Sequence, residues 1–353
     1  MIRKFVLLLC WFVIGFTTTG FTQLRNRRAD VDTDYIDDFP EIASVRFNIS
    51  RRYFDFALRS KIGAKEKVSY APNVQGTYGF SLYYRKLGLD LSLGLPASNR
   101  ENTLFGKTRF FDFQVNSYGK KIGYDISFQS YKGFYQANPG DFDKSLKSWS
   151  AMKGYPQRPD LRCFNFGLNG YYVFNYKKFS YQAAFDQTER QLRSAGTFLV
   201  MGSSFFTRIR SDSTLFPSAS TPAEGLAFKE GYFYTLAVAP GFAYSLIIKE
   251  NFYLSPSICW GLGIRQQSYD IDAQRYKGMA IGQKINFRLA AGYYGQQVFA
   301  GINMVLDNNR IGMENVLLTT SAVNIRLFVG YRFNRLFGKD VQNHKLDRLL
   351  TNN

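Results

Sequence analysis

Seven charged residues have the types and spacing needed to do chemistry, or to bind a ligand, inside a protein made of β-strands. Each falls on the polar positions of a segment in which apolar and polar residues alternate. Alternate side chains of a strand point to opposite faces, so these seven are candidates for one shared interior surface. They are Asp90, Asp112, Asp125, Arg59, Arg288, Arg326 and Arg332.

The three aspartates fall on consecutive predicted strands, so their carboxylates could cluster on one wall. Neighbouring carboxylates can divide acid and base roles, because each raises the pKa of the other. The arginines fall on the first predicted strand and the last ones, which become neighbours when a barrel closes. An acidic wall facing a basic wall favours ion pairing in a narrow interior over a solute path, a binding site or acid–base chemistry. We therefore assign no catalytic residue.

Histidine chemistry is nearly excluded by composition. The single histidine of the 353 residues, His344, lies beyond the last predicted strand. Ser-His hydrolases and histidine-based metal sites would lack their central residue. We expect no metal, no cofactor and a non-enzymatic role.

The elements that must position the seven charges have a two-residue rhythm. The run Leu87-Gly88-Leu89-Asp90-Leu91-Ser92-Leu93-Gly94-Leu95 is its cleanest example, and similar runs recur to Phe333. Aromatic residues make up 17% of the chain, as the two aromatic girdles of a membrane barrel require. The pattern predicts an all-β fold: a closed antiparallel transmembrane β-barrel whose apolar side chains face lipid.

The N-terminus has the three parts of a secretory signal. Arg3 and Lys4 are followed by the apolar core 5–16 and a small-residue zone that ends near Gly20. The sequence therefore predicts a cleaved signal peptide at 1–22, a periplasmic lead-in at 23–43, a barrel at 44–333 and a periplasmic tail at 334–353. Export through this signal would place the protein in the cell outer membrane.

The connections leave the strand count open at 12 or 14. Short turns near 85–88, 119–120, 176–178, 248–250 and 295–296 contrast with long polar segments at 97–107, 136–160, 265–281 and 308–317. Short periplasmic turns and long external loops are typical of a membrane barrel. Between two of the short turns lie three apolar runs, 179–187, 195–210 and 231–247, where an even number is needed. Either 195–210 folds back near Gly202, or one run is not a barrel strand.

The net charge indicates which kinds of molecule the protein contacts, and the cysteine content bears on whether a disulfide forms. The net charge is +18, or +16 once Arg3 and Lys4 leave with the signal. Much of it lies in predicted turns, where cations meet anionic lipid headgroups, so we expect contact with outer-membrane lipid and none with nucleic acid. Cys163 and Cys259 remain after cleavage, and the sequence leaves open whether they pair.

The last predicted strand carries an assembly signal. It ends in Gly330-Tyr331-Arg332-Phe333, with aromatic residues two positions apart. We expect the barrel-assembly machinery to recognise this strand up to Phe333. The following twenty residues, with Leu336, Val341 and Leu346 at roughly helical spacing, predict a short helical tail.

Several short motifs together resemble one known family. They are Asp32-Thr33-Asp34-Tyr35-Ile36, Gly94-Leu95-Pro96, Gly106-Lys107-Thr108 running into Phe111-Asp112, Tyr131-Lys132-Gly133-Phe134-Tyr135 and Ser194-Ala195-Gly196. The combination resembles the Bacteroidota family catalogued as domain of unknown function 4421, over nearly the whole mature chain. The resemblance implies a secreted, barrel-like outer-membrane protein and brings no catalytic residues with it.

The role expected from the sequence is a narrow channel, or a structural or surface-interaction protein. Two alternatives stay open. One is a lipid-modifying or lipid-binding barrel enzyme, for which the aspartates and basic turns are the support. The other is a soluble periplasmic lipid-binding β-barrel, which would need a polar outward face.

Overall fold

The computed structural model describes residues 31–38, 43–62, 67–84, 87–141, 154–216, 226–295, 297–333, 335–336 and 339–340. The predicted signal peptide at 1–22 lies outside these residues. No helix within them is long and apolar enough to cross a membrane.

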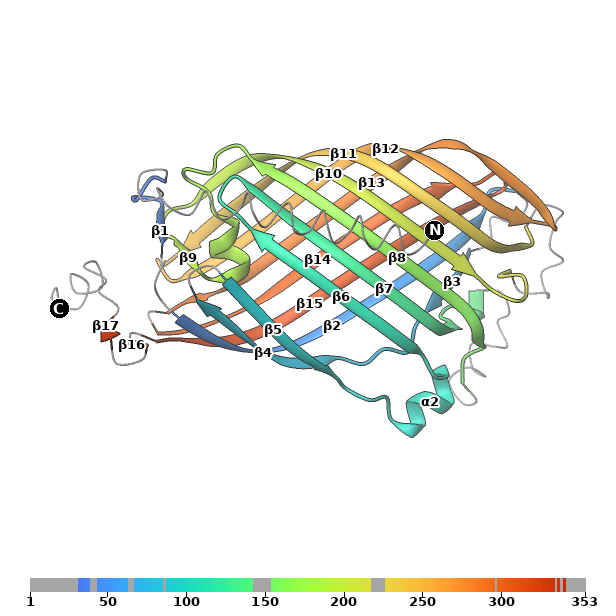
Figure 1. The fold of residues 1–353 in the computed structure, drawn as a ribbon, viewed down its shortest axis with the longest axis horizontal. Coiled ribbons are helices and arrows are strands. Elements are labelled where there is room, and N and C mark those ends of the chain that lie inside the picture. Colours follow the sequence, from blue (N-terminus) through green and yellow to red (C-terminus); the bar gives the residue numbers. More distant parts are fainter. Residues whose placement is uncertain are drawn as a thin grey trace.

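Ten antiparallel strands close into a ring, because the ladder between β15 and β2 joins the two ends of the sheet (Figure 1). The ring does not confirm the expected count of 12 or 14. Its strands are β2 (Ala43–Ser60), β3 (Lys67–Ala71), β7 (Ile122–Gln136), β8 (Gln157–Val173), β10 (Ala195–Arg210), β11 (Phe228–Ile248), β12 (Phe252–Ile271), β13 (Gln274–Tyr294), β14 (Val298–Gly312) and β15 (Val316–Phe333).

Three further strands belong to the same sheet without being part of this ring: β4 (Thr77–Tyr84), β5 (Leu87–Gly94) and β6 (Arg109–Tyr118). The strands β3 and β4 follow each other along one edge of β2, and β5 pairs with β4. The helix α2 (Asn99–Phe105) leads to β6, which pairs with β7. No ladder joins β5 to β6 among the described residues. Alternation identified both strands, but it carries no information about which edges meet.

Two ends of the barrel can be distinguished in Figure 1. The end with α2 is called here the α2 end; at the other end, where β9 is labelled, residues Asn175–Gln191 pack against side chains of the ring strands and are called the plug. The predicted loops 265–281 and 308–317 are largely strand at the α2 end, where β12 and β13 meet in a tight turn at Asp272 and Ala273. Both turn residues have positive φ, as the favoured two-residue hairpin turns require.

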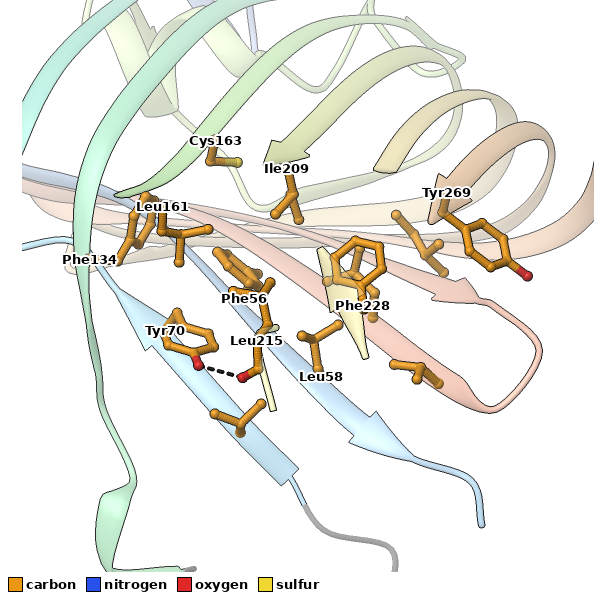
Figure 2. Packing of buried hydrophobic residues seen from close by; sticks show 14 of the residues in the cluster. Phe56, Leu58, Tyr70, Phe134, Leu161, Cys163, Ile209, Leu215, Phe228 and Tyr269 are labelled. Carbon is orange, nitrogen blue, oxygen red and sulfur yellow. Dashed lines mark hydrogen bonds between the residues drawn. The ribbon is translucent and has the colours of Figure 1, made fainter. Parts of the chain in front are cut away.

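At the α2 end the apolar face of the strands points inward. Phe54, Phe56 and Leu58 of β2 are buried, and they pack with residues from strands all around the ring and from the segment at Leu215 (Figure 2). The Tyr70 hydroxyl donates a hydrogen bond to the Leu215 carbonyl. An apolar core therefore fills this end of the barrel.

The plug corrects one predicted strand. The run 179–187 alternates in sequence, but it forms the short π-helix η3 (Gln182–Asp186), followed by β9 (Glu189–Gln191). Both faces of this segment are buried, since Ser180 and Ala184 are as hidden as Phe179 and Phe185. This is the run that does not join the wall. The predicted lead-in also packs here, because β1 (Ile36–Asp38) pairs with β9.

The described part of the predicted helical tail is not helical. Residues Arg335–Leu336 (β16) and Lys339–Asp340 (β17) form a small two-stranded sheet, and 341–353 lie outside the described residues. Cys163 and Cys259 are both free and buried. They belong to separate apolar clusters near opposite ends of the barrel, so they do not pair.

We predict that Leu58→Ala lowers the free energy of unfolding by about 2–5 kcal/mol, because it opens a cavity in the core of the α2 end. The neighbouring Arg59→Ala is the control, expected within about 0.5 kcal/mol of wild type because its side chain is exposed. Urea titration of the protein folded in detergent measures both values. Equal losses would mean that this end of the barrel is not packed as described.

A second prediction concerns the segment that covers this core. Arg158 donates to both carboxylate oxygens of Asp160 at 2.9 Å and to the carbonyls of Ser213 and Thr214. Hydrogen bonds from Arg158 lower the pKa of Asp160 to about 2. Because the folded-state pKa is depressed, this stabilisation is complete above the unfolded value of about 3.9 and is lost as the pH falls toward 2. In urea titrations across this range, Asp160→Asn should flatten the pH dependence of stability.

Candidate functional site

The candidate site is a belt of polar and charged side chains inside the barrel, between the core of the α2 end and the plug. The alternation of β7, β8, β10, β13 and β14 turns these side chains inward, where they are buried or nearly so. The belt includes Gln129, Asn165, Asn169, Ser203, Thr207, Lys284, Asn286, Arg288 and Asp307.

Arg288 forms the longest-range ion pair of the belt. Its side chain is 1% exposed, and its guanidinium binds the carboxylate of Asp125. Arg288 lies on β13 and Asp125 on β7, which are not neighbours in the ring, so the pair crosses the interior. Arg288 also donates to Asn286 at 2.9 Å and lies 4.9 Å from the ring centre of Tyr171. Two of the seven predicted charges, one acidic and one basic, therefore meet across the interior.

Lys284 and Asp307 form a second buried pair, on the adjacent strands β13 and β14. Asn169 and Asn286 each donate to the other oxygen of Asp307 at 3.3 Å. The Lys284 ammonium lies 3.6 Å from the ring centre of Phe205. Burying a charge is costly unless it is paired and hydrogen-bonded, and these contacts meet that need.

Asp112 begins a hydrogen-bonded chain along the wall. Its carboxylate accepts from Gln129 and Tyr131, both at 3.0 Å. The amide oxygen of Gln129 accepts from Asn165, and the oxygen of Asn165 accepts from the Thr207 hydroxyl at 2.7 Å. This series of hydrogen bonds links the strands β6, β7, β8 and β10, so Asp112 contributes to bonding between strands.

The aspartates do not cluster as the sequence suggested. In the β6–β7 register Asp112 lies opposite Gln129, whereas Asp125 lies opposite Asn116. Four residues along a strand separate the two levels by roughly 13 Å. The backbone of Asp90 lies opposite Ser81 in β4, and its side chain lies outside the described residues.

The predicted arginines lie in three different surroundings. Arg326 faces inward and is half-buried. Arg332 is buried at the plug, where it donates to the carbonyls of Gly295 and Gln187 at 2.8 and 3.1 Å. Arg59 was wrongly assigned to the interior. Its neighbour Leu58 is fully buried in the core, so Arg59 is turned outward and is exposed.

Sequence reasoning missed Lys284, Asp307 and Arg265. All three are buried on inward faces, and Lys284 has the parity of Arg288 within Lys284-Ile285-Asn286-Phe287-Arg288. The same two-residue rule would have found it. Arg265 is 0% exposed, and its guanidinium donates to the Thr235 hydroxyl at 2.9 Å.

The belt holds its charges in place, and this limits its chemistry. Asp125 and Asp307 are bound to cations, and Asp112 is bound to two donors. Among the residues that the structure describes, no group of three or more His, Cys, Asp or Glu side chains could hold a metal ion.

We predict that Arg288→Met destabilises the barrel by about 3–5 kcal/mol, because it leaves Asp125 buried and unpaired. The double variant Arg288→Met/Asp125→Leu should recover most of this loss. Arg275→Met breaks the exposed pair with Asp270, in which the arginine is 53% exposed, and serves as control at no more than about 1 kcal/mol. Urea titration measures the free energy of unfolding of each variant. A double variant as unstable as Arg288→Met would contradict the pairing.

Similar solved structures include the outer membrane protease OmpT from Escherichia coli, with TM-score 0.35 and 8% identity over 84% of this chain and 98% of that one. Another is Ail of Yersinia pestis, with TM-score 0.23 and 12% identity over 83% and 99%. The toluene transporter TodX of P. putida has TM-score 0.24 and 9% identity over 86% and 91%.

At these TM-scores the likeness supports no statement about activity or ligand. No curated protein matches this chain. The family model described as "Domain of unknown function (DUF4421)" matches residues 30–333. The chain therefore belongs to this family.

Proposed function

We propose that this chain is an integral outer-membrane β-barrel of a Gram-negative bacterium of the Bacteroidota, exported through a cleaved signal at 1–22. The support is an outward apolar band around the ring. It includes exposed residues on every ring strand except β3: Ile49, Ile122, Tyr172, Phe198, Val238, Trp260, Ile281, Ile302 and Leu327. A water-soluble barrel would expose this band to solvent at a high free-energy cost, whereas a bilayer covers it.

The proposed orientation places the plug end in the periplasm and the α2 end outside the cell. At the plug end a short turn joins β11 to β12, and the longer connection from β8 to β10 folds into the barrel as the plug, whereas the connection from β7 to β8 at the α2 end is long. The last strand, β15, ends at Phe333, where the barrel-assembly machinery would recognise it.

The proposed role is structural or surface-interacting and non-enzymatic. The observation that carries it is the packing of the interior at three levels: the apolar core of the α2 end, the ion-paired belt, and the plug. Side chains from several strands meet at each level. This arrangement supports an anchored surface structure over the narrow channel that the sequence also allowed.

The test is conductance of the purified protein in planar bilayers, after a gel shift on boiling has confirmed a folded barrel. We expect no conductance steps from the wild type, because packed side chains occupy the interior. Reproducible steps would restore the narrow-channel function. A protein that fractionates as soluble and shows no heat-dependent shift would instead favour the periplasmic lipid-binding barrel.

A further inference from the structure

Four cations lie directly opposite one another on four neighbouring strands at the α2 end. Arg109 pairs in register with Lys132, Lys132 with Arg162, and Arg162 with Arg210, on β6, β7, β8 and β10. All four side chains are exposed. Their strand neighbours Tyr131, Leu161 and Ile209 are buried in the core of the α2 end. The cations therefore form an outward-facing row, called here the cationic row.

Like charges in directly opposite positions destabilise a sheet. Within the described residues, no ion pair joins Arg109, Lys132 or Arg162 to a carboxylate. Beyond Arg210 the same register continues through two carboxylates, Glu230 and Asp270, and then the cation Arg275. Salt bridges form there, at 2.9 Å between Arg208 and Glu230 and at 2.7 Å between Arg275 and Asp270. The carboxylates beyond the row are thus bound to arginines outside it, and they do not form salt bridges with Arg109, Lys132 or Arg162.

A chain of aromatic rings lies next to the cationic row, toward the middle of the barrel. Phe111, Phe128, Phe164 and Phe206 come from the same four strands, and their successive ring centres are 5.8, 5.0 and 5.9 Å apart. They stand two or four residues along the strand from the cations. Farther along the strands, exposed apolar side chains such as Phe113 and Phe198 follow. Aromatic girdles mark the interface between hydrocarbon and headgroups, which puts the cationic row at headgroup level on the outer side.

An open cavity adjoins the Arg210 end of the row. It has a volume of about 690 Å³, and its charged lining comprises the cations Arg210, Lys229 and Arg275 and the carboxylates Asp212, Glu230 and Asp270. Lys229 is exposed and adds a further cation beside Arg210. The cavity offers space next to the row for a bulky polar headgroup.

We propose that the cationic row binds the phosphate groups of a phosphorylated glycolipid of the outer leaflet, while the adjacent phenylalanines contact its acyl chains. This site rests on the proposed membrane insertion and deepens it by naming one lipid class. Arginine forks and lysine ammonium groups both bind phosphate. An acyl chain beside the aromatic rings separates this ligand from free phosphate, which the row alone would bind.

The experiment titrates the purified full-length barrel in detergent with diphosphorylated lipid A and counts bound lipid by native mass spectrometry. The test variant is Lys132→Gln/Arg162→Gln. The control is Lys177→Gln/Lys249→Gln, which removes the same charge from exposed turns at the plug end. We expect the test variant to bind about 25-fold more weakly, at about five-fold for each cation, and the control to bind like wild type.

Three further measurements make the result decisive. Dephosphorylated lipid A should bind as weakly to wild type as the phosphorylated lipid binds to the test variant. Inorganic phosphate at the same concentration should not displace the lipid. Equal losses in the two double variants, equal binding of both lipids, or displacement by inorganic phosphate would each overturn the proposal. The gel shift on boiling, measured on every variant, separates failure of this site from failure of the barrel to fold.

Discussion

The ladder between β2 and β15 is the interaction on which the rest of the structure depends. It runs in one unbroken register from Ala43 opposite Phe333 to Ser60 opposite Val316, and so joins the first long strand to the last. Strands cross a bilayer only when their backbone groups are bonded to one another, because lipid offers no hydrogen-bond partners. Closure also separates an inside from an outside, and every alternating strand then has two different environments.

The interior of the closed barrel is filled by three different layers: the apolar core of the α2 end, the belt and the plug. Apolar packing at the α2 end and around the plug removes water from both sides of the belt, and low polarity makes each belt charge costly unless it is paired. The pairs Arg288–Asp125 and Lys284–Asp307 follow from that constraint. Breaking such a pair is costly, whereas replacing both partners with well-packed apolar residues is often neutral. Arg288–Asp125 also ties opposite walls together, which a ladder between neighbouring strands cannot do.

Along a single strand the same side chains keep facing inward, but the polarity of the inward and outward residues changes from one end to the other. This change of polarity leads from the interior to the proposed lipid site. On β2, Ile49 is exposed and Ser50 buried near the plug end, whereas at the α2 end Leu58 is buried and Arg59 exposed. Odd-numbered residues of β2 face outward along its whole length. In the proposed membrane orientation, the change from apolar to polar outward side chains therefore marks the level at which the surroundings change from hydrocarbon to water. The cationic row lies at this level, between aromatic rings and the polar outer surface.

Much of this architecture was determined by the sequence itself. The period of two follows from strand geometry, so it identified the all-β class, most strands and the inward parity of Asp112, Asp125 and Arg288. The Tyr131-Lys132-Gly133 motif also has a local cause. Gly133 has φ +90° beside a register shift, where a Cβ would lie 2.3 Å from the Lys107 carbonyl.

Tertiary structure decided what alternation cannot contain. Alternation reports that two faces differ, but not which face meets water, lipid or core, and so Arg59 was assigned to the wrong side. Alternation does not report which strand edges pair, so the sequence could not predict that ten strands close the ring. A segment buried on both faces, such as the plug, has the same apolar rhythm as a wall strand. The distance between Asp112 and Asp125, and the contact of Arg288 with Asp125 across the barrel, depend on register and closure, which long-range backbone bonding sets.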